Sequence, residues 1–121
     1  MRRTLALISA LTLAAAARAA EPEDDALVCA PTLAETAAAI RAVPGLALSP
    51  TEEGRDFTSF RHDPTGTLYT FTLPGAPGHP AVLKRKMVPI ENGAALLLSA
   101  CGYGDDQAGF EALKRGFGAR D

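Results

Sequence analysis

Two cysteines and two histidines are the side chains of this sequence best suited to covalent or metal chemistry. A nucleophilic thiol needs a base within hydrogen-bond reach, and nothing in the sequence brings His62 or His79 to Cys29. No Cys-x-x-Cys motif is present, and neither histidine has the spacing to carboxylates that a metal site needs. The sequence therefore predicts no catalytic residue, no metal ligand and no cofactor. The alternatives of a small envelope hydrolase or a metal-binding protein stay open through His62, Asp63 and His79.

The two cysteines form an even pair, which in an oxidising compartment predicts a disulfide between Cys29 and Cys101. Such a bond would join the beginning of the domain to its last strand across a long loop. In the chain-entropy model a loop of that length stabilises the fold by about 4 kcal/mol. Two buried free thiols are the alternative.

The N-terminus indicates export, because Arg2 and Arg3 precede an uncharged run over residues 4–16. Small residues follow at the two positions that a signal peptidase reads. The uncharged run is too short to span about 30 Å of hydrocarbon. We therefore predict a cleavable signal peptide over residues 1–19 and a periplasmic or secreted protein with no membrane span after cleavage.

The charge balance excludes some partners. The chain carries 12 Lys and Arg against 14 Asp and Glu side chains, a net charge of −2. Arg2, Arg3 and Arg18 would leave with the signal peptide, which changes the net charge to −5. This acidic balance argues against nucleic acid or an anionic lipid surface as the main partner. After an acidic leader over residues 20–30, we expect one small soluble domain over residues 31–121.

Two helices are predicted near the ends of that domain. A capping box formed by Thr32 and Glu35 starts the first helix, and a Pro-Gly pair ends it. Asp105 or Asp106 caps the second helix. The apolar stripe of the second helix comprises Phe110, Leu113 and Phe117.

Four strands are expected between the helices, over residues 55–62, 67–73, 81–90 and 94–103. An Asp-Pro-Thr-Gly turn joins the first two strands, and Asn92-Gly93 joins the last two. Residues 49–54 and the Pro- and Gly-rich residues 74–80 are expected to form loops. The resulting fold class is α+β: an N-terminal helix, a four-stranded antiparallel β-meander and a C-terminal helix, with both helices packed on one sheet face.

The predicted register decides which side chains that face carries. With Asp63 opposite Thr67, the first hairpin presents Phe57, Ser59, Arg61, Tyr69, Phe71 and Leu73 to the core. With Glu91 opposite Ala94, the second hairpin presents Leu83, Arg85, Met87, Leu96, Leu98 and Ala100, because burying one arginine costs less than burying two lysines. This choice leaves Cys101 on the outer face, in conflict with the disulfide unless Cys29 reaches round an edge.

The outer face would then carry more apolar surface than a soluble monomer usually exposes. This candidate binding surface comprises Phe60, Leu68, Lys84, Lys86, Val88, Ile90 and Tyr103. The alternatives are a wrong register, cover by loops, or ordinary solvation of the exposed side of a sheet. The rigid 74–80 loop is a second candidate, since a rigid loop binds at low entropic cost. Its candidate binding residues are Gly75, Ala76, Gly78 and His79.

These observations predict a non-catalytic binding module of the cell envelope. Its partner would be an envelope protein or a small apolar ligand, and inhibition of an envelope hydrolase is one concrete form. A self-associating structural envelope protein is the alternative, because the outer face could equally join copies of the chain into an oligomer.

Overall fold

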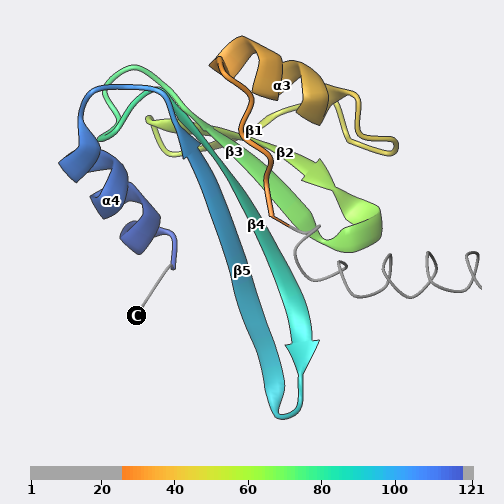
Figure 1. Ribbon diagram of the computed structural model, residues 1–121. Helices are drawn as coiled ribbons and strands as arrows, with labels where there is room; N and C mark the ends of the chain where they lie inside the picture. The colour runs from red at the N-terminus through yellow and green to blue at the C-terminus, as the bar shows by residue number, and fades with distance from the viewer. Residues whose placement is uncertain (1–25, 119–121) are drawn as a thin grey trace, which may run out of the picture.

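The computed structural model describes residues 26–118, which form two helices and one five-stranded antiparallel sheet (Figure 1). The predicted signal peptide lies outside the described residues. The elements follow one another as α3 (Leu33–Arg41), β1 (Thr51–Glu53), β2 (Phe57–His62), β3 (Thr67–Thr72), β4 (Ala81–Ile90), β5 (Gly93–Gly102) and α4 (Gln107–Gly116). None of the helices within residues 26–118 is long and apolar enough to cross a membrane. The predicted α+β class is confirmed.

The two helices begin where their capping residues stand. The Thr32 side chain accepts a hydrogen bond from the Glu35 backbone N–H, and the Glu35 side chain accepts one from the Thr32 backbone, so the predicted capping box is present. Asp106 caps α4 by accepting from the Gly109 backbone N–H at 2.9 Å. These side chains satisfy donors that the first turn of a helix leaves without an intrahelical partner.

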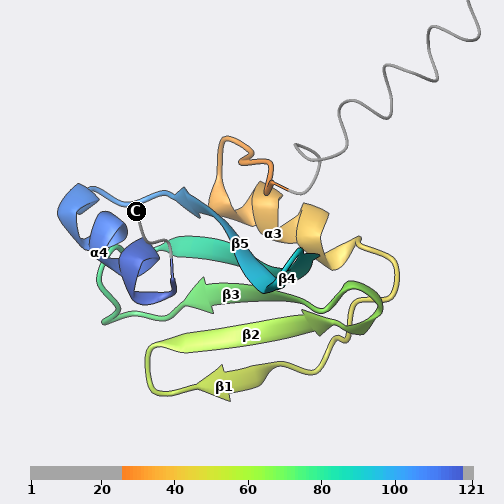
Figure 2. The ribbon, with the colours of Figure 1, turned by 90° about the horizontal axis from the view of Figure 1, so that it is seen from below.

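The strands lie in the same order in the sheet as in the sequence, with β1 and β5 at its two edges (Figure 2). The sequence did not predict β1. This strand has only three residues, pairs with β2, and lies in the segment that we expected to be a polar loop. Its Thr-Glu-Glu sequence lacks the apolar alternation by which a strand is recognised.

The helices cover opposite faces of the sheet, so the prediction that both pack on one face is wrong. Ile40 of α3 packs with Val82 of β4, whereas Leu113 of α4 packs with Leu83, the next residue along β4. Successive strand residues point to opposite faces, and Val82 and Leu83 are both fully buried. Figure 1 accordingly shows α3 and α4 on different sides of β4 and β5.

The register of the first hairpin differs from the predicted one. His62, not Asp63, stands opposite Thr67. The Asp63–Thr65 turn closes with a hydrogen bond from Gly66 N–H to the Asp63 carbonyl at 3.2 Å, and Gly66 takes a left-handed φ of +67°. This connection is one residue longer than expected, and a shift by one residue exchanges the two faces of a strand. Phe57 and Ser59 therefore share their face with Leu68, Thr70 and Thr72 instead of with Tyr69 and Phe71.

The second hairpin keeps its predicted faces despite a different loop. Ile90 stands opposite Gly93, so Glu91 and Asn92 form the turn that we had assigned to Asn92 and Gly93. The observed register differs from the predicted one by two residues in total, which leaves every side chain on the face assigned to it. Leu83 and Ala100 thus share one face as predicted.

Candidate functional site

A disulfide joins Cys29 and Cys101, as the sequence predicted, with their Cα atoms 5.6 Å apart. Cys101 lies on the face that α3 covers, which removes the conflict between the predicted disulfide and the predicted sheet. Residues 26–30, assigned to the leader by sequence, pack beside this bond. Leu27 N–H donates to Ser99 Oγ at 2.8 Å, and the Tyr103 hydroxyl donates to the Ala30 carbonyl at 2.8 Å.

The two histidines occupy opposite ends of β3, so the fold does not bring them together. His62 faces Thr67 at the beginning of that strand, whereas His79 Nδ1 lies 2.7 Å from the hydroxyl of Thr72 at its end. The His62 ring is held on both sides: Nδ1 lies 2.6 Å from Thr65 Oγ1 and Nε2 donates to the Pro44 carbonyl at 2.9 Å. A carbonyl oxygen only accepts hydrogen bonds, which places the proton on Nε2.

His62 consequently connects the segment after α3 to the β2–β3 turn. Neither of its nitrogens has a lone pair left for a metal or a substrate proton in this arrangement. Across residues 26–118, no group of three or more His, Cys, Asp and Glu side chains is close enough to hold a metal ion.

A polar cluster centred on Arg85 lies on the face that α4 covers. Arg85 Nη2 donates to Glu53 Oε1 and to Thr70 Oγ1, both at 2.7 Å. Ser59 Oγ donates to the same Glu53 oxygen at 3.0 Å and lies 2.8 Å from Thr70 Oγ1. The guanidinium also lies over the Phe117 ring, 4.6 Å from its centre. The cluster connects β1 to β4 and to the end of α4. The hydroxyls of Ser59 and Thr70 are too deeply buried to meet a substrate.

The 74–80 loop packs against α4. Ala76 and Gly78 are buried, whereas Gly75 is exposed and His79 is half-buried. A Cβ atom on Gly78 would lie 2.6 Å from Phe110 Cα, so the loop and the helix approach as closely as a glycine allows. The loop is therefore a part of the packed structure, and the residues it leaves exposed are Pro74, Gly75 and Pro77.

The predicted outer surface separates into a covered part and an exposed part. Tyr103 lies under α3, where its hydroxyl is 2.6 Å from Thr36 Oγ1. Phe60 is half-buried, with its ring edge-on to Phe71. Leu68 lies on the opposite face from Phe60, because Phe60 stands opposite Tyr69. Placing these residues together on a bare face was therefore wrong, since α3 covers part of the face and the register removes Leu68 from it.

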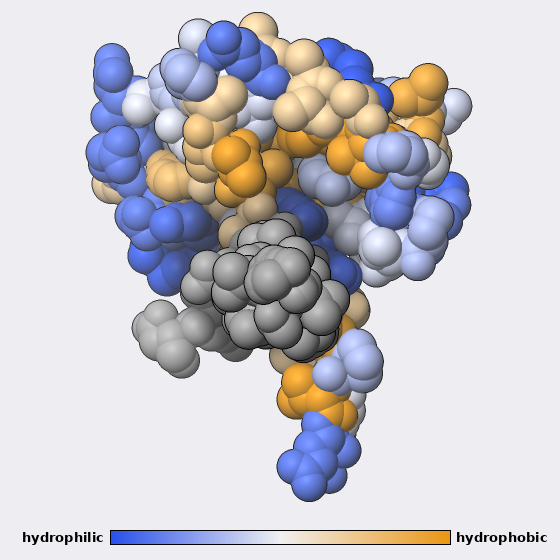
Figure 3. Space-filling model, turned by 45° about the vertical axis from the view of Figure 1, so that its right-hand side comes forward, coloured by the Kyte–Doolittle hydropathy of each residue, from blue (hydrophilic) through white to orange (hydrophobic). Residues whose placement is uncertain are grey.

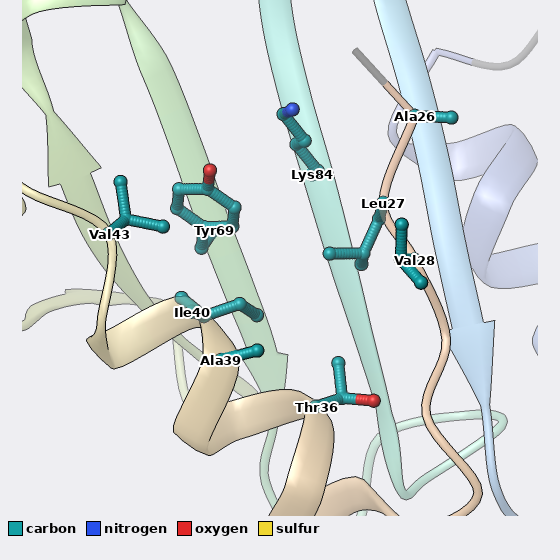
Figure 4. A pocket seen from close by; sticks show the side chains of 9 residues that line it. All are labelled: Ala26, Leu27, Val28, Thr36, Ala39, Ile40, Val43, Tyr69 and Lys84. Atoms are coloured by element: carbon teal, nitrogen blue, oxygen red, sulfur yellow. The ribbon is translucent and has the colours of Figure 1, made fainter. Parts of the chain in front are cut away.

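A small groove remains beside α3, between the helix and residues 26–28. Its volume is about 170 Å³. Figure 4 shows Tyr69 and Lys84 on neighbouring strands, with Thr36 and Ile40 of α3 on one side and Leu27 on the other. Burial raises the pKa of the Tyr69 phenol. A volume of this size holds a benzene-sized apolar group, which limits the groove to a small ligand.

The exposed part of the predicted surface belongs to a hairpin that extends beyond the rest of the sheet. β3 pairs with β4 only as far as Lys86, which stands opposite Thr67. Beyond that pair, β4 is paired with β5 alone, from Met87 opposite Leu96 to Ile90 opposite Gly93. We name residues 87–97 the β4–β5 arm. Figure 1 shows it reaching away from both helices.

Apolar side chains are exposed on both faces of this arm. Ile90 and Leu97 lie on the α3 side with exposed fractions of 54% and 40%, together with the half-buried Val88. Met87 lies on the α4 side and is 54% exposed. The space-filling view shows hydrophobic residues along the arm and hydrophilic ones at its tip (Figure 3). The exposure of Met87 was not predicted, because its whole strand face was expected to belong to the core.

Lys84 and Lys86 lie on the α3 side of β4, both half-buried. Lys84 borders the groove, whereas Lys86 stands opposite Leu97 at the base of the arm.

Comparison of the chain with protein-family models, with curated proteins and with solved structures found no match.

Proposed function

We propose that this protein is a non-catalytic, protein-binding module of the cell envelope that docks its partner through the β4–β5 arm. The observation that carries the proposal is the exposure of Met87, Ile90 and Leu97 on a hairpin that extends beyond β3. A two-stranded hairpin alone is marginally stable in water. Exposed apolar side chains gathered on such an extension mark a protein-interaction site.

Three features support an interaction module over an enzyme. The two histidines lie at opposite ends of β3, the two cysteines are bonded to each other, and the buried hydroxyls of Ser59 and Thr70 bond to Arg85 and Glu53. These groups hold the fold together. The disulfide and the predicted signal peptide support an address in the periplasm or outside the cell.

The test compares two lysine substitutions on the full chain. Ile90→Lys places a charge on the arm, and Leu48→Lys places the same charge on a side chain that is 70% exposed and lies outside the arm. Tagged protein is cross-linked in its native envelope, captured and analysed by mass spectrometry. We expect the Ile90 variant to lose a specific partner that the wild type and the Leu48 variant both retain. Equal capture by all three proteins would refute the role of the arm.

A further inference from the structure

Along the part of the chain that the structure describes, no strand pairs with the outer edge of β5, and residues 27–29 contact this strand only at Ser99–Cys101. β5 is the last strand of the sheet, and β4 is the one strand that pairs with it. An unpaired edge presents backbone N–H and C=O groups that can accept a further strand. Natural proteins usually protect such edges with charged side chains, prolines or short strands.

β5 carries none of these protective features. It has ten residues, from Gly93 to Gly102, without a charged side chain or a proline. The free edge of β4 in the arm is protected, because it contains Pro89, which has no N–H to offer, and begins after Lys86. The edge at β1 is protected as well, because that strand is only three residues long and carries two glutamates.

The sequence of β5 is also complementary to itself. Three consecutive leucines, Leu96, Leu97 and Leu98, stand at its centre. A two-fold axis perpendicular to the sheet and within this stretch would pair β5 with β5 of a second copy in antiparallel fashion. Residues opposite each other would share a face, so leucines would meet across the axis and no like charges would be opposed.

We propose that β5 pairs with β5 of a second copy of this chain, joining two five-stranded sheets into one continuous sheet. The proposal rests on the proposed function, because it names the partner of the β4–β5 arm as a second copy. A foreign strand could use the same edge, but a second copy needs no further sequence feature, because the two-fold pairing places leucine opposite leucine and opposes no like charges.

Sedimentation velocity over a range of concentrations tests the pairing on the disulfide-bonded protein. We expect a monomer–dimer equilibrium for the wild type. Leu97→Lys would place two lysines close together across the axis and weaken self-association at least about tenfold. Leu48→Lys is the matched control, since it adds the same charge to an exposed leucine that lies outside the arm and should leave the dimer intact. Circular dichroism establishes that both variants are folded.

Amide hydrogen exchange provides the second measurement. Protection of β5 amides should rise with protein concentration, whereas protection of β1 amides should stay constant. A dimer that Leu97→Lys leaves intact, or that Leu48→Lys disrupts equally, would overturn pairing through this edge. A wild type that is monomeric at every concentration but captures a different partner through the arm would overturn self-pairing and leave the proposed function standing. A monomer that captures nothing would overturn both.

Discussion

The two edges of the sheet differ in how they end. β1 is short and acidic, and the side chain of its Glu53 is bonded to Arg85 and Ser59. β5 is long and uncharged, and only its base is secured, by the disulfide at Cys101 and the hydrogen bond between Leu27 and Ser99. A short, charged strand therefore protects its edge against further pairing, whereas a long, uncharged strand without such features stays ready for another strand.

The largest effect is expected from removing the anchor at the base of β5. Replacing both Cys29 and Cys101 by serine should lower the free energy of unfolding by about 4 kcal/mol, because the unfolded chain loses the constraint of a loop between residues 72 positions apart. Urea denaturation of the oxidised wild type and the double variant measures the difference. Reduced wild type should match the variant. A loss below about 1 kcal/mol would show that residues 26–30 hold β5 without the disulfide.

A smaller effect is expected from removing the anchor of β1. Glu53→Ala should cost about 1.5–3 kcal/mol, because it breaks charged hydrogen bonds and leaves the guanidinium of Arg85 half-buried without its carboxylate. Glu52→Ala is the matched control: this neighbour is exposed, and its loss should change the free energy by no more than about 0.5 kcal/mol. Equal effects of the two substitutions would show that the Arg85 cluster does not secure this edge.

The smallest effect is expected at the exposed Arg61–Asp63 pair, which sharpens the contrast with the half-buried pair at β1. The Arg61 guanidinium donates to the Asp63 carboxylate at 3.1 Å and lowers its pKa. A lowered folded-state pKa stabilises the protein above the unfolded value of about 3.9, and this stabilisation is lost as the pH falls through the folded pKa.

Asp63→Asn should therefore lower the melting temperature slightly at pH 7. The difference should disappear in strong acid and shrink in high salt, because water and ions screen an exposed pair. Thermal unfolding at several pH values and salt concentrations measures it. A difference that grows in acid would contradict this origin.

Local signals in the sequence predicted most of the elements. The Thr32–Glu35 capping box, the Asp106 cap and the Asp-Pro-Thr-Gly turn all act within a few residues, and the structure contains each of them. The disulfide was also predictable, because only one pair of cysteines exists. β1 was not predictable, since a short polar strand is stabilised by its pairing with β2 and by the Arg85 cluster, which a local pattern does not reveal.

The candidate site was predicted only in part, because contacts between residues distant in the sequence decide which of its side chains are exposed. Val88 and Ile90 were predicted to lie on an apolar outer face away from both helices, and both lie on the β4–β5 arm, on the face that α3 covers elsewhere. Leu68 was predicted to share that outer face because the expected register was one residue away from the observed one. Tyr103 was expected to be exposed, whereas α3 and residues 26–30 cover it through contacts that are distant in the sequence.

The sequence by itself determined the α+β composition, the helix starts, the two hairpins and the disulfide, because neighbouring residues or a unique pair of cysteines decide these features. The tertiary structure alone decided that the helices cover opposite faces, that β4 and β5 continue beyond β3, and that β1 closes one edge while β5 leaves the other open. These features depend on the relative lengths of the paired strands and on packing between residues that are distant in the sequence. A pattern with a period of two residues shows that a strand has two faces but does not show what packs on either of them.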